Sequence, residues 1–167
     1  MIRIAEKTDI RRIEEFIALA KASLKKDGVD QWQKSNPDKN LIEGQIEKKS
    51  GYVYERDGEV YAYAFLSENA EPTYDRYEND FEGSTYLVIH TFMVDSKSKI
   101  KGLGTKFMGE IVSLAENLGK DSLRIDTHED NFRMRGLLDK FSFRKLGLIQ
   151  VDEDGIFKDR ICYEKVL

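Results

Sequence analysis

The feature that most constrains this sequence is a run of ten mostly apolar residues, 85–94, followed directly by a basic segment that contains two glycines. This run is the most apolar in the chain and is typical of a strand buried on both faces. Residues 95–106 read DSKSKIKGLGTK, and apolar residues at helical spacing follow them. A buried strand that passes through a glycine loop into a helix is typical of an α/β fold.

The glycine segment has the chemistry of an anion-binding loop. Gly102 and Gly104 allow backbone amides to approach a ligand closely, and the start of a helix leaves amides without partners. Four lysines and no acidic residue lie between Ser96 and Lys106. The spacing does not match the Walker pattern, and Phe107 stands where the dinucleotide fingerprint requires its third glycine. The sequence therefore excludes these two nucleotide-binding motifs.

The remaining elements follow from hydrophobic periodicity and turn residues. Pro37 is expected in the first turn of a second helix, which Gly51 closes. Asp57 and Gly58 predict a two-residue hairpin turn, because glycine accepts positive φ. Residues 67–84 show little periodicity and predict a long surface excursion. The other expected strands are 2–5, 52–56, 59–66, 123–127, 143–151 and 160–166, and the expected helices are 10–27, 37–51, 104–118 and 131–140.

Composition narrows the class of protein further. A chain of 167 residues can bury one well-packed core, so 1–167 is expected to be a single domain. Its 27 Lys and Arg against 31 Asp and Glu give a net charge of −4, which argues against a broad nucleic-acid-binding face. The single cysteine, Cys162, excludes an internal disulfide, and one cysteine with two histidines cannot form a structural zinc set. Without a signal peptide or a membrane-spanning run, the protein is expected to be cytoplasmic.

Two motifs resemble those of the GNAT superfamily of N-acetyltransferases, in the same order and separation. The basic-x-x-Gly-x-Gly segment after the buried strand resembles the family's pyrophosphate loop. Residues 131–143, NFRMRGLLDKFSF, resemble its second signature, an Asn on a short helix followed by Lys and a small-residue-Phe pair. The element order also matches. The resemblance covers essentially the whole chain, and the type it resembles is a small, functionally unassigned bacterial one. It implies the GNAT acyl-CoA N-acyltransferase fold, an α/β fold with a central mixed (α+β) sheet flanked by helices.

The resemblance implies acetyl-CoA as the acetyl donor and assigns residues to it. Met93 and Val94 would present main-chain groups to the pantetheine arm, and a bulge in this region would turn a backbone N–H toward the thioester oxygen. Asn131 would contact the cofactor near its thioester end. The backbone that would hold the pyrophosphate is that of Lys99, Ile100, Lys101, Gly102, Leu103, Gly104 and Thr105.

The catalytic base has two candidates. His90 lies on the strand from which the family usually draws catalytic groups, and imidazole titrates near neutrality. A hydrogen-bonded core histidine is the alternative reading. Strict alternation places His90 on the same face as Val88 and Phe92. His128 is the second candidate, although its segment could equally cap the helix that follows.

The acid that protonates the departing thiolate has several candidates. The family often has a tyrosine where Leu138 stands in this chain. This leaves Tyr163, Tyr86 or water for the role. Each tyrosine can also be explained as a packing residue, because tyrosine is common in strands.

The acceptor side is expected to involve Trp32, which either walls the acceptor pocket or anchors the core. The excursion 67–84 carries six acidic residues and one arginine, a charge of −5, which favours a cationic amine. The sequence thus predicts an N-acetyltransferase that moves the acetyl group to a primary amine of a small molecule or peptide by direct attack, without a metal. The alternative is a non-catalytic acyl-CoA-binding or regulatory module on the same fold. No nucleic acid or membrane partner is expected, and a homodimer is left open.

Overall fold

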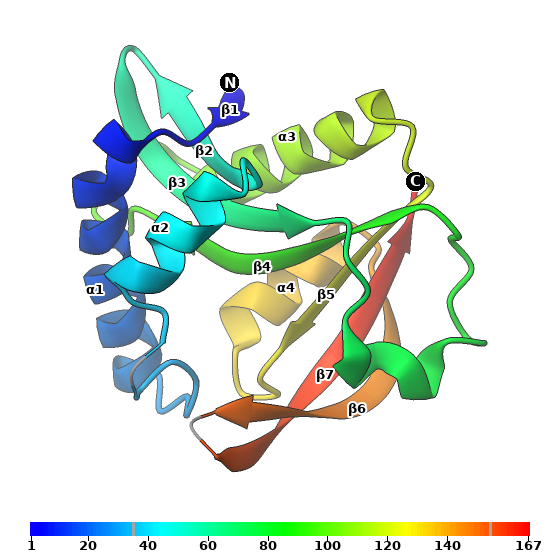
Figure 1. The fold of residues 1–167 in the computed structure, drawn as a ribbon. Helices are drawn as coiled ribbons and strands as arrows, with labels where there is room; N and C mark the ends of the chain where they lie inside the picture. Colours follow the sequence, from blue (N-terminus) through cyan, green and yellow to red (C-terminus); the bar gives the residue numbers. More distant parts are fainter. Residues whose placement is uncertain (35, 154) are drawn as a thin grey trace.

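Residues 1–34, 36–153 and 155–167, which the computed structural model describes, fold around a seven-stranded mixed sheet (Figure 1). The strand order is β1-β2-β3-β4-β5-β7-β6, with β4 and β5 parallel and the other neighbours antiparallel. The elements are β1 (Ile2–Ile4), η1 (Lys7–Asp9), α1 (Ile10–Lys26), α2 (Lys39–Glu47), β2 (Gly51–Arg56), β3 (Glu59–Ser67), η2 (Pro72–Tyr77), β4 (Tyr86–Val94), α3 (Leu103–Asn117), β5 (Ser122–Thr127), α4 (Phe132–Lys140), β6 (Arg144–Glu153) and β7 (Ile156–Val166).

Helices cover both faces of this sheet (Figure 1). α3 and α4 lie on one face, where Phe107 and Leu138 belong to the largest core cluster. α1 and α2 lie on the opposite face, where Phe16 and Ile42 pack over β2 and β3. On this second face, η2 places Tyr74 against β4, β6 and β7. The predicted α/β class, with a mixed sheet flanked by helices, is confirmed. None of the helices in the described ranges is long and apolar enough to cross a bilayer.

β4 and β5 separate before either strand ends. Their last parallel pair is Ile89 with Ile125. β4 then continues along β3 as far as Val94, while β5 continues along β7 as far as Thr127. The ends of β4 and β5 therefore diverge at the centre of the sheet, and their facing edges are left without strand pairing.

The turn between β2 and β3 is predicted correctly from two adjacent residues. Asp57 and Gly58 join β2 to β3 with φ angles of 54° and 80°, which confirms the predicted hairpin.

The last strand is longer than predicted. β7 begins at Ile156 rather than at residue 160, because its pairing with β6 extends out to Glu153.

The predicted boundaries of the second helix are wrong at both ends. The helix begins at Lys39, after Pro37, because the Asp38 carboxylate accepts a hydrogen bond from Leu41 N–H at 2.9 Å and caps the helix there. Gly51 does not end the helix but is the first residue of β2.

The segment between β3 and β4 is more than a surface loop. It contains η2, whose Tyr74 is 3% exposed and packs against Val88 and Cys162. The prediction of a surface excursion is wrong for this part, because an aromatic ring from the excursion covers the sheet.

Burial raises the pKa of the Cys162 thiol to about 12, so this cysteine is a protonated core residue.

Glu164 of β7 holds the end of the excursion on the sheet. Its side chain is fully buried, and its carboxylate accepts hydrogen bonds from Glu82 N–H and Gly83 N–H, both at 3.0 Å. Ser122 Oγ donates at 2.9 Å, and Arg144 Nη2 at 3.1 Å. Burial alone would raise the pKa of Glu164, but the hydrogen bonds outweigh burial and lower the pKa below its usual range.

We expect Glu164→Gln to lower the free energy of unfolding by about 2 kcal/mol at neutral pH, because hydrogen bonds to a charged acceptor are weakened. The pKa of Glu164 is depressed in the folded state. Its contribution is therefore present above the pKa of the unfolded chain and is lost as the pH falls through the lower folded-state pKa. Urea unfolding between about pH 7 and about pH 3 measures this loss.

The control for this measurement is Glu82→Gln. The Glu82 carboxylate is exposed and makes a surface ion pair with Arg144 at 3.4 Å, so its loss should change stability by less than about 0.5 kcal/mol. Equal losses in the two variants, or a loss in Glu164→Gln that does not depend on pH, would contradict this role for Glu164.

Candidate functional site

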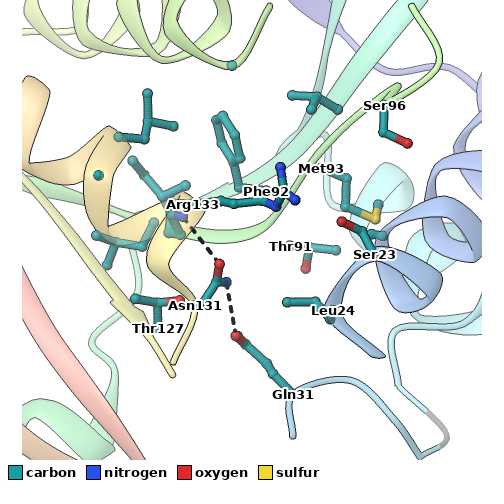
Figure 2. Close-up of a pocket in the computed structure, with 18 of the residues that line it drawn as sticks. Ser23, Leu24, Gln31, Thr91, Phe92, Met93, Ser96, Thr127, Asn131 and Arg133 are labelled. Atoms are coloured by element: carbon teal, nitrogen blue, oxygen red, sulfur yellow. Dashed lines mark hydrogen bonds between the residues drawn. The ribbon is translucent and has the colours of Figure 1, made fainter. Parts of the chain in front are cut away.

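A pocket of about 700 Å³ lies where β4 and β5 diverge. Its walls come from β4 residues 89–94, β5 residues 125–127, the start of α3, one side of α4 and the last turns of α1. Figure 2 shows side chains from these elements around a common space. Because α1 and the α3–α4 pair cover opposite faces of the sheet, the pocket passes through the sheet. Its volume is in the range of sites for small molecules and cofactors.

The predicted anion loop lies at one end of this pocket. Gly102 and Gly104 line it, and Gly102 has a φ of 67°, the left-handed conformation that favours glycine. The backbone N–H groups of residues 101–105 find no acceptor in the described part of the chain. These amides lie at the positive end of the α3 dipole, and the exposed Lys99 and Lys101 add charge. This end of the pocket can bind an anion.

The other predicted loop residues take different positions. Thr105 lines the pocket, and its hydroxyl accepts a hydrogen bond from Lys140 Nζ of α4 at 3.3 Å. The side chain of Leu103 is buried in the core, and Ile100 packs against the same cluster. What these two residues can offer a ligand is therefore their main chain.

Asp95 holds the start of this loop. It is 8% exposed, and its carboxylate accepts hydrogen bonds from Lys97 N–H at 2.9 Å and from Arg12 Nη2 of α1 at 2.6 Å. The Asp95 carboxylate therefore links the first turn of the loop to α1, while the lysine side chains of the loop remain exposed.

β4 has a β-bulge, but not at the predicted position. The register between β3 and β4 shifts between Tyr63 and Phe65, opposite residues 91–92 rather than 93–94. Thr91 has a φ of 54°, which is rare for a β-branched residue. Its hydroxyl accepts a hydrogen bond from Gln45 Nε2 of α2 at 3.1 Å. A contact from a distant helix therefore accompanies the bulge, and the strand sequence alone does not reveal it.

Met93 and Val94 both line the pocket. Asp95 N–H donates to Tyr61 O of β3 at 2.8 Å, and backbone groups alternate in direction along an antiparallel strand. The N–H and C=O of Val94 therefore point away from β3, toward the open edge of β4. The side chain of Met93 is 2% exposed and packs in the core under α1 and α2.

The bulge changes which residues share a face with His90. Val88 lies on the face that η2 covers, whereas Phe92 lies on the opposite face, where its ring stacks on Phe107 of α3 with centroids 5.2 Å apart. The prediction that His90 and Phe92 share a face is wrong, because the extra residue at Thr91 inverts the alternation. His90 reaches the pocket from the η2 side.

Two carboxylates and a tyrosine lie near His90. His90 Nε2 is 3.9 Å from Glu71 Oε2, and Asp126 lines the pocket from β5. Tyr74 OH donates a hydrogen bond to Asp126 Oδ2 at 2.7 Å. Burial lowers the pKa of His90, although Asp126 and Glu71 act in the opposite direction. Burial raises the pKa of Asp126, although the bond from Tyr74 opposes this shift. At neutral pH this end of the pocket holds a neutral imidazole beside acidic groups.

Asn131 lies at the start of α4 and faces the pocket (Figure 2). Its Oδ1 accepts a hydrogen bond from Met134 N–H at 3.2 Å, which caps α4, and its Nδ2 donates to Gln31 Oε1 at 3.3 Å. Next to it, Arg133 Nε donates to Asp27 Oδ2 at 2.7 Å. These contacts join α4 to the segment that follows α1, along the wall of the pocket.

Three residues considered for proton transfer, Tyr163, Tyr86 and His128, are not among the described residues that line the pocket. Tyr163 is 2% exposed and packs in the core under α3 and α4, as does the fully buried Leu138. The ring of Tyr86 packs against an arginine side chain. His128 Nδ1 accepts a hydrogen bond from Asp130 N–H at 3.1 Å within the turn before α4. Of the two predicted catalytic residues, the structure brings His90 to the pocket and leaves Tyr163 in the core.

Trp32 lines the pocket and also a second cavity of about 200 Å³, so its indole lies between the two. The main pocket is also lined by three residues that are not among the predicted site residues, Asp126, Thr127 and Gln31. Asp126 and Thr127 end a strand that runs parallel to its neighbour, and α/β sheets place ligands at such carboxyl ends. This signal could have identified both. Gln31 has no comparable signal.

Comparison with known proteins gives a family match. The family model described as "Acetyltransferase (GNAT) family" matches residues 14–143. No curated protein sequence matches the chain. Among solved structures, a GNAT-family acetyltransferase from Streptococcus agalactiae is 30% identical, with a TM-score of 0.84, over 100% of this chain and 95% of that chain.

Two similar structures contain acetyl-CoA. The structure of yncA from Salmonella typhimurium, with its cofactor acetyl-CoA, is 20% identical, with a TM-score of 0.69, over 99% of this chain and 92% of that chain. A GNAT superfamily phosphinothricin acetyltransferase from Sinorhizobium meliloti, in complex with acetyl-CoA, is 18% identical, with a TM-score of 0.70, over 100% of this chain and 88% of that chain. At these identities the similarity concerns the fold.

Proposed function

Because this chain belongs to the GNAT family of acetyltransferases, we propose that it moves the acetyl group of acetyl-CoA to a primary amine of a small molecule or peptide by direct attack. The observation that carries the proposal is the pocket through the sheet. It has unpartnered amides at one end, and a neutral histidine with two acidic neighbours at the other. We assign the whole chain, 1–167, to one acetyltransferase domain.

The residues at the donor end fit acetyl-CoA. The five amides of 101–105 and the exposed Lys99 and Lys101 suit a pyrophosphate. The main chain of Val94, which points to the open edge of β4, suits the amides of the pantetheine arm, and Asn131 is assigned to the thioester end. When bound there, acetyl-CoA supplies an activated acetyl carbon with a thiolate as its leaving group.

His90 is assigned as the base that receives a proton from the acceptor nitrogen. Burial keeps its imidazole neutral at physiological pH, which a proton acceptor requires. The bulge at Thr91 lies next to His90 along β4, so we assign the oxyanion donor to this bulge. An ammonium acceptor loses two protons in the overall reaction. One passes through His90 to solvent, and the other ends on the thiol of coenzyme A.

Charge at the His90 end favours a cationic acceptor. Glu71 and Asp126 lie near His90, and because burial raises the pKa of Asp126, Glu71 supplies most of the attraction for a protonated amine. A carboxylate beside the reacting nitrogen would be repelled by the same charge. The proposed acceptors are therefore cationic amines without an adjacent carboxylate, and the indole of Trp32 supplies an apolar wall.

We expect thiol release from acetyl-CoA to be fastest with diamines and other cationic primary amines, and slowest with α-amino acids. Added salt should raise KM for the cationic amines, because screening weakens their attraction to the acidic groups. Glu71→Gln should raise the same KM about 5-fold, the effect of about 1 kcal/mol of lost attraction. Initial rates over a panel of amines at low and high salt measure all three effects.

The matched control is Glu78→Gln, which removes an exposed acid from the same excursion and should leave KM unchanged. A preference for neutral or anionic acceptors that does not respond to salt would exclude the cationic class. Binding of acetyl-CoA without thiol release on any amine would instead exclude amine acetylation.

A further inference from the structure

Thr127 has a buried hydroxyl at the wall of the pocket that finds no hydrogen-bond partner. It is the last residue of β5, it is 1% exposed, and its Oγ1 lacks a donor or acceptor within the described ranges. Buried polar groups in native proteins nearly always have a partner, and an unpaired one costs free energy. Because Thr127 lines the pocket beside Asn131 (Figure 2), a bound ligand can supply the missing partner.

Thr127 and its neighbour Asp126 point to opposite faces of the sheet. Thr127 pairs with Ile161, which belongs to the core under α3 and α4. Asp126 pairs with Cys162, which belongs to the cluster under η2. The two residues therefore reach the pocket from its two sides, Asp126 from the side of His90 and Thr127 from the side of α4.

In the proposed function, acetyl-CoA extends from the anion loop along the α4 side, and the acceptor amine enters from the side of His90. The reacting group then lies where the two sides meet, at the diverging ends of β4 and β5. Thr127 is at this point and on the donor side. We propose that the Thr127 hydroxyl donates a hydrogen bond to the thioester sulfur of acetyl-CoA and to the thiolate that forms from it. This inference rests on the proposed function.

The contact would act on the leaving group. As the acceptor nitrogen bonds to the acetyl carbon, the carbon–sulfur bond breaks and its electron pair goes to sulfur. A thiolate accepts a hydrogen bond more strongly than a thioester sulfur, so the contact strengthens along the reaction and stabilises the transition state more than the ground state. Thr127 keeps its proton, and the thiolate takes up the second proton that the ammonium acceptor loses, passed on through water.

The neighbouring side chains on this wall are less suited to reach the sulfur than the Thr127 hydroxyl. Leu138 has no donor and is fully buried. Asn131 donates one Nδ2 hydrogen to Gln31 and accepts at Oδ1 from Met134 N–H at the start of α4, and these two bonds fix the orientation of its amide. Thr105 also lines this side, but it lies at the anion-loop end and accepts a hydrogen bond from Lys140. Thr127 is therefore the hydroxyl that lies at the thioester end among the described lining residues.

The test compares Thr127→Val, which keeps the shape and removes the hydroxyl, with Thr127→Ser, which keeps the hydroxyl. We expect kcat to fall about 10- to 100-fold in the valine variant and to stay within about 3-fold of wild type in the serine variant. KM for acetyl-CoA should change little in both. The Tm of the valine variant should equal or exceed that of wild type, because an unpaired buried hydroxyl is removed.

A second measurement needs no acceptor and no turnover. The thiolate absorbance of bound coenzyme A, followed against pH, gives the pKa of its thiol, which Thr127→Val should raise by about one unit, a tenfold shift in the ionisation constant. If no amine is acetylated but this pKa still shifts, the proposed function fails and the assignment of Thr127 stands. An unchanged kcat with an unchanged thiol pKa overturns the assignment. Loss of Tm in the valine variant without a pKa shift also overturns it, and shows a structural role.

Discussion

Gly102→Val is expected to weaken the binding of acetyl-CoA by at least about 100-fold. Gly102 has a φ of 67° at the start of α3, and a β-branched residue in this conformation costs about 1–2 kcal/mol. The chain would relieve this strain by rotating the peptide groups of 101–105, whose amides are free for an anion. Each hydrogen bond to a charged group is worth about 1.5–3 kcal/mol, so two misdirected amides are enough to explain a loss of binding of this size. Calorimetric titration with coenzyme A measures the effect.

Gly104→Val tests the same loop by another route. Gly104 lines the pocket and a Cβ there meets only Leu137 Cδ2, at 3.8 Å, so the larger side chain narrows the pocket without backbone strain. Gly109→Ala, on the same helix, is the control and should bind like wild type, because its Cβ would have open space out to Phe141 at 4.0 Å. Binding by Gly102→Val within about 3-fold of wild type, with circular dichroism unchanged, would rule out the loop as the pyrophosphate site.

The parts of the fold that the sequence predicts well depend on neighbouring residues. The hairpin at Asp57 and Gly58 and the buried strand before the glycine loop are encoded by adjacent side chains, and both are present. The end of α3 is similar, because Gly119 adopts a φ of 70° just after the helix, next to the predicted end at residue 118. These features need no knowledge of the rest of the chain.

The parts that the sequence does not predict depend on contacts between distant elements. Tyr63 OH of β3 donates to Gln45 Oε1 at 2.8 Å, and Gln45 Nε2 donates to Thr91 at the bulge, so three elements meet there. Tyr74, from a segment that reads as an acidic loop, seals one side of the site by bonding to Asp126. Hydrophobic periodicity reports on one element at a time and therefore misses both contacts.

The acidic excursion shows the same limit. Its charge of −5 suggests a general attraction for cations, yet the structure brings the carboxylate of Glu71 close to His90, while Glu82 pairs with Arg144 at the sheet edge. Asp126, which lies outside the excursion, supplies the second acidic group at the site. Net charge in a segment thus indicates the sign of a partner, whereas position in the fold decides which charges act on it.

His90→Asn is expected to reduce kcat/KM by about 100- to 10,000-fold, the usual contribution of a positioned general base. The wild-type rate should rise with pH as His90 loses its proton and then level off. Burial lowers the pKa of His90 below 6.5, so the imidazole stays neutral to lower pH and the rising limb lies below this value. In the asparagine variant this limb should disappear. Initial rates at saturating acetyl-CoA, measured against pH, give both the loss and the limb.

Two further variants separate this role from a purely structural one. Glu71 acts to raise the pKa of His90 from 3.9 Å, so Glu71→Gln should move the rising limb to still lower pH. His128→Asn changes the chain's other histidine, which lies in the turn before α4, and should leave the limb in place. If His90→Asn keeps most of the rate, or if the limb stays fixed in Glu71→Gln, the proton is accepted by another group. Asp126 also lines the pocket and burial raises its pKa, so Asp126→Asn is the variant to measure next in that case.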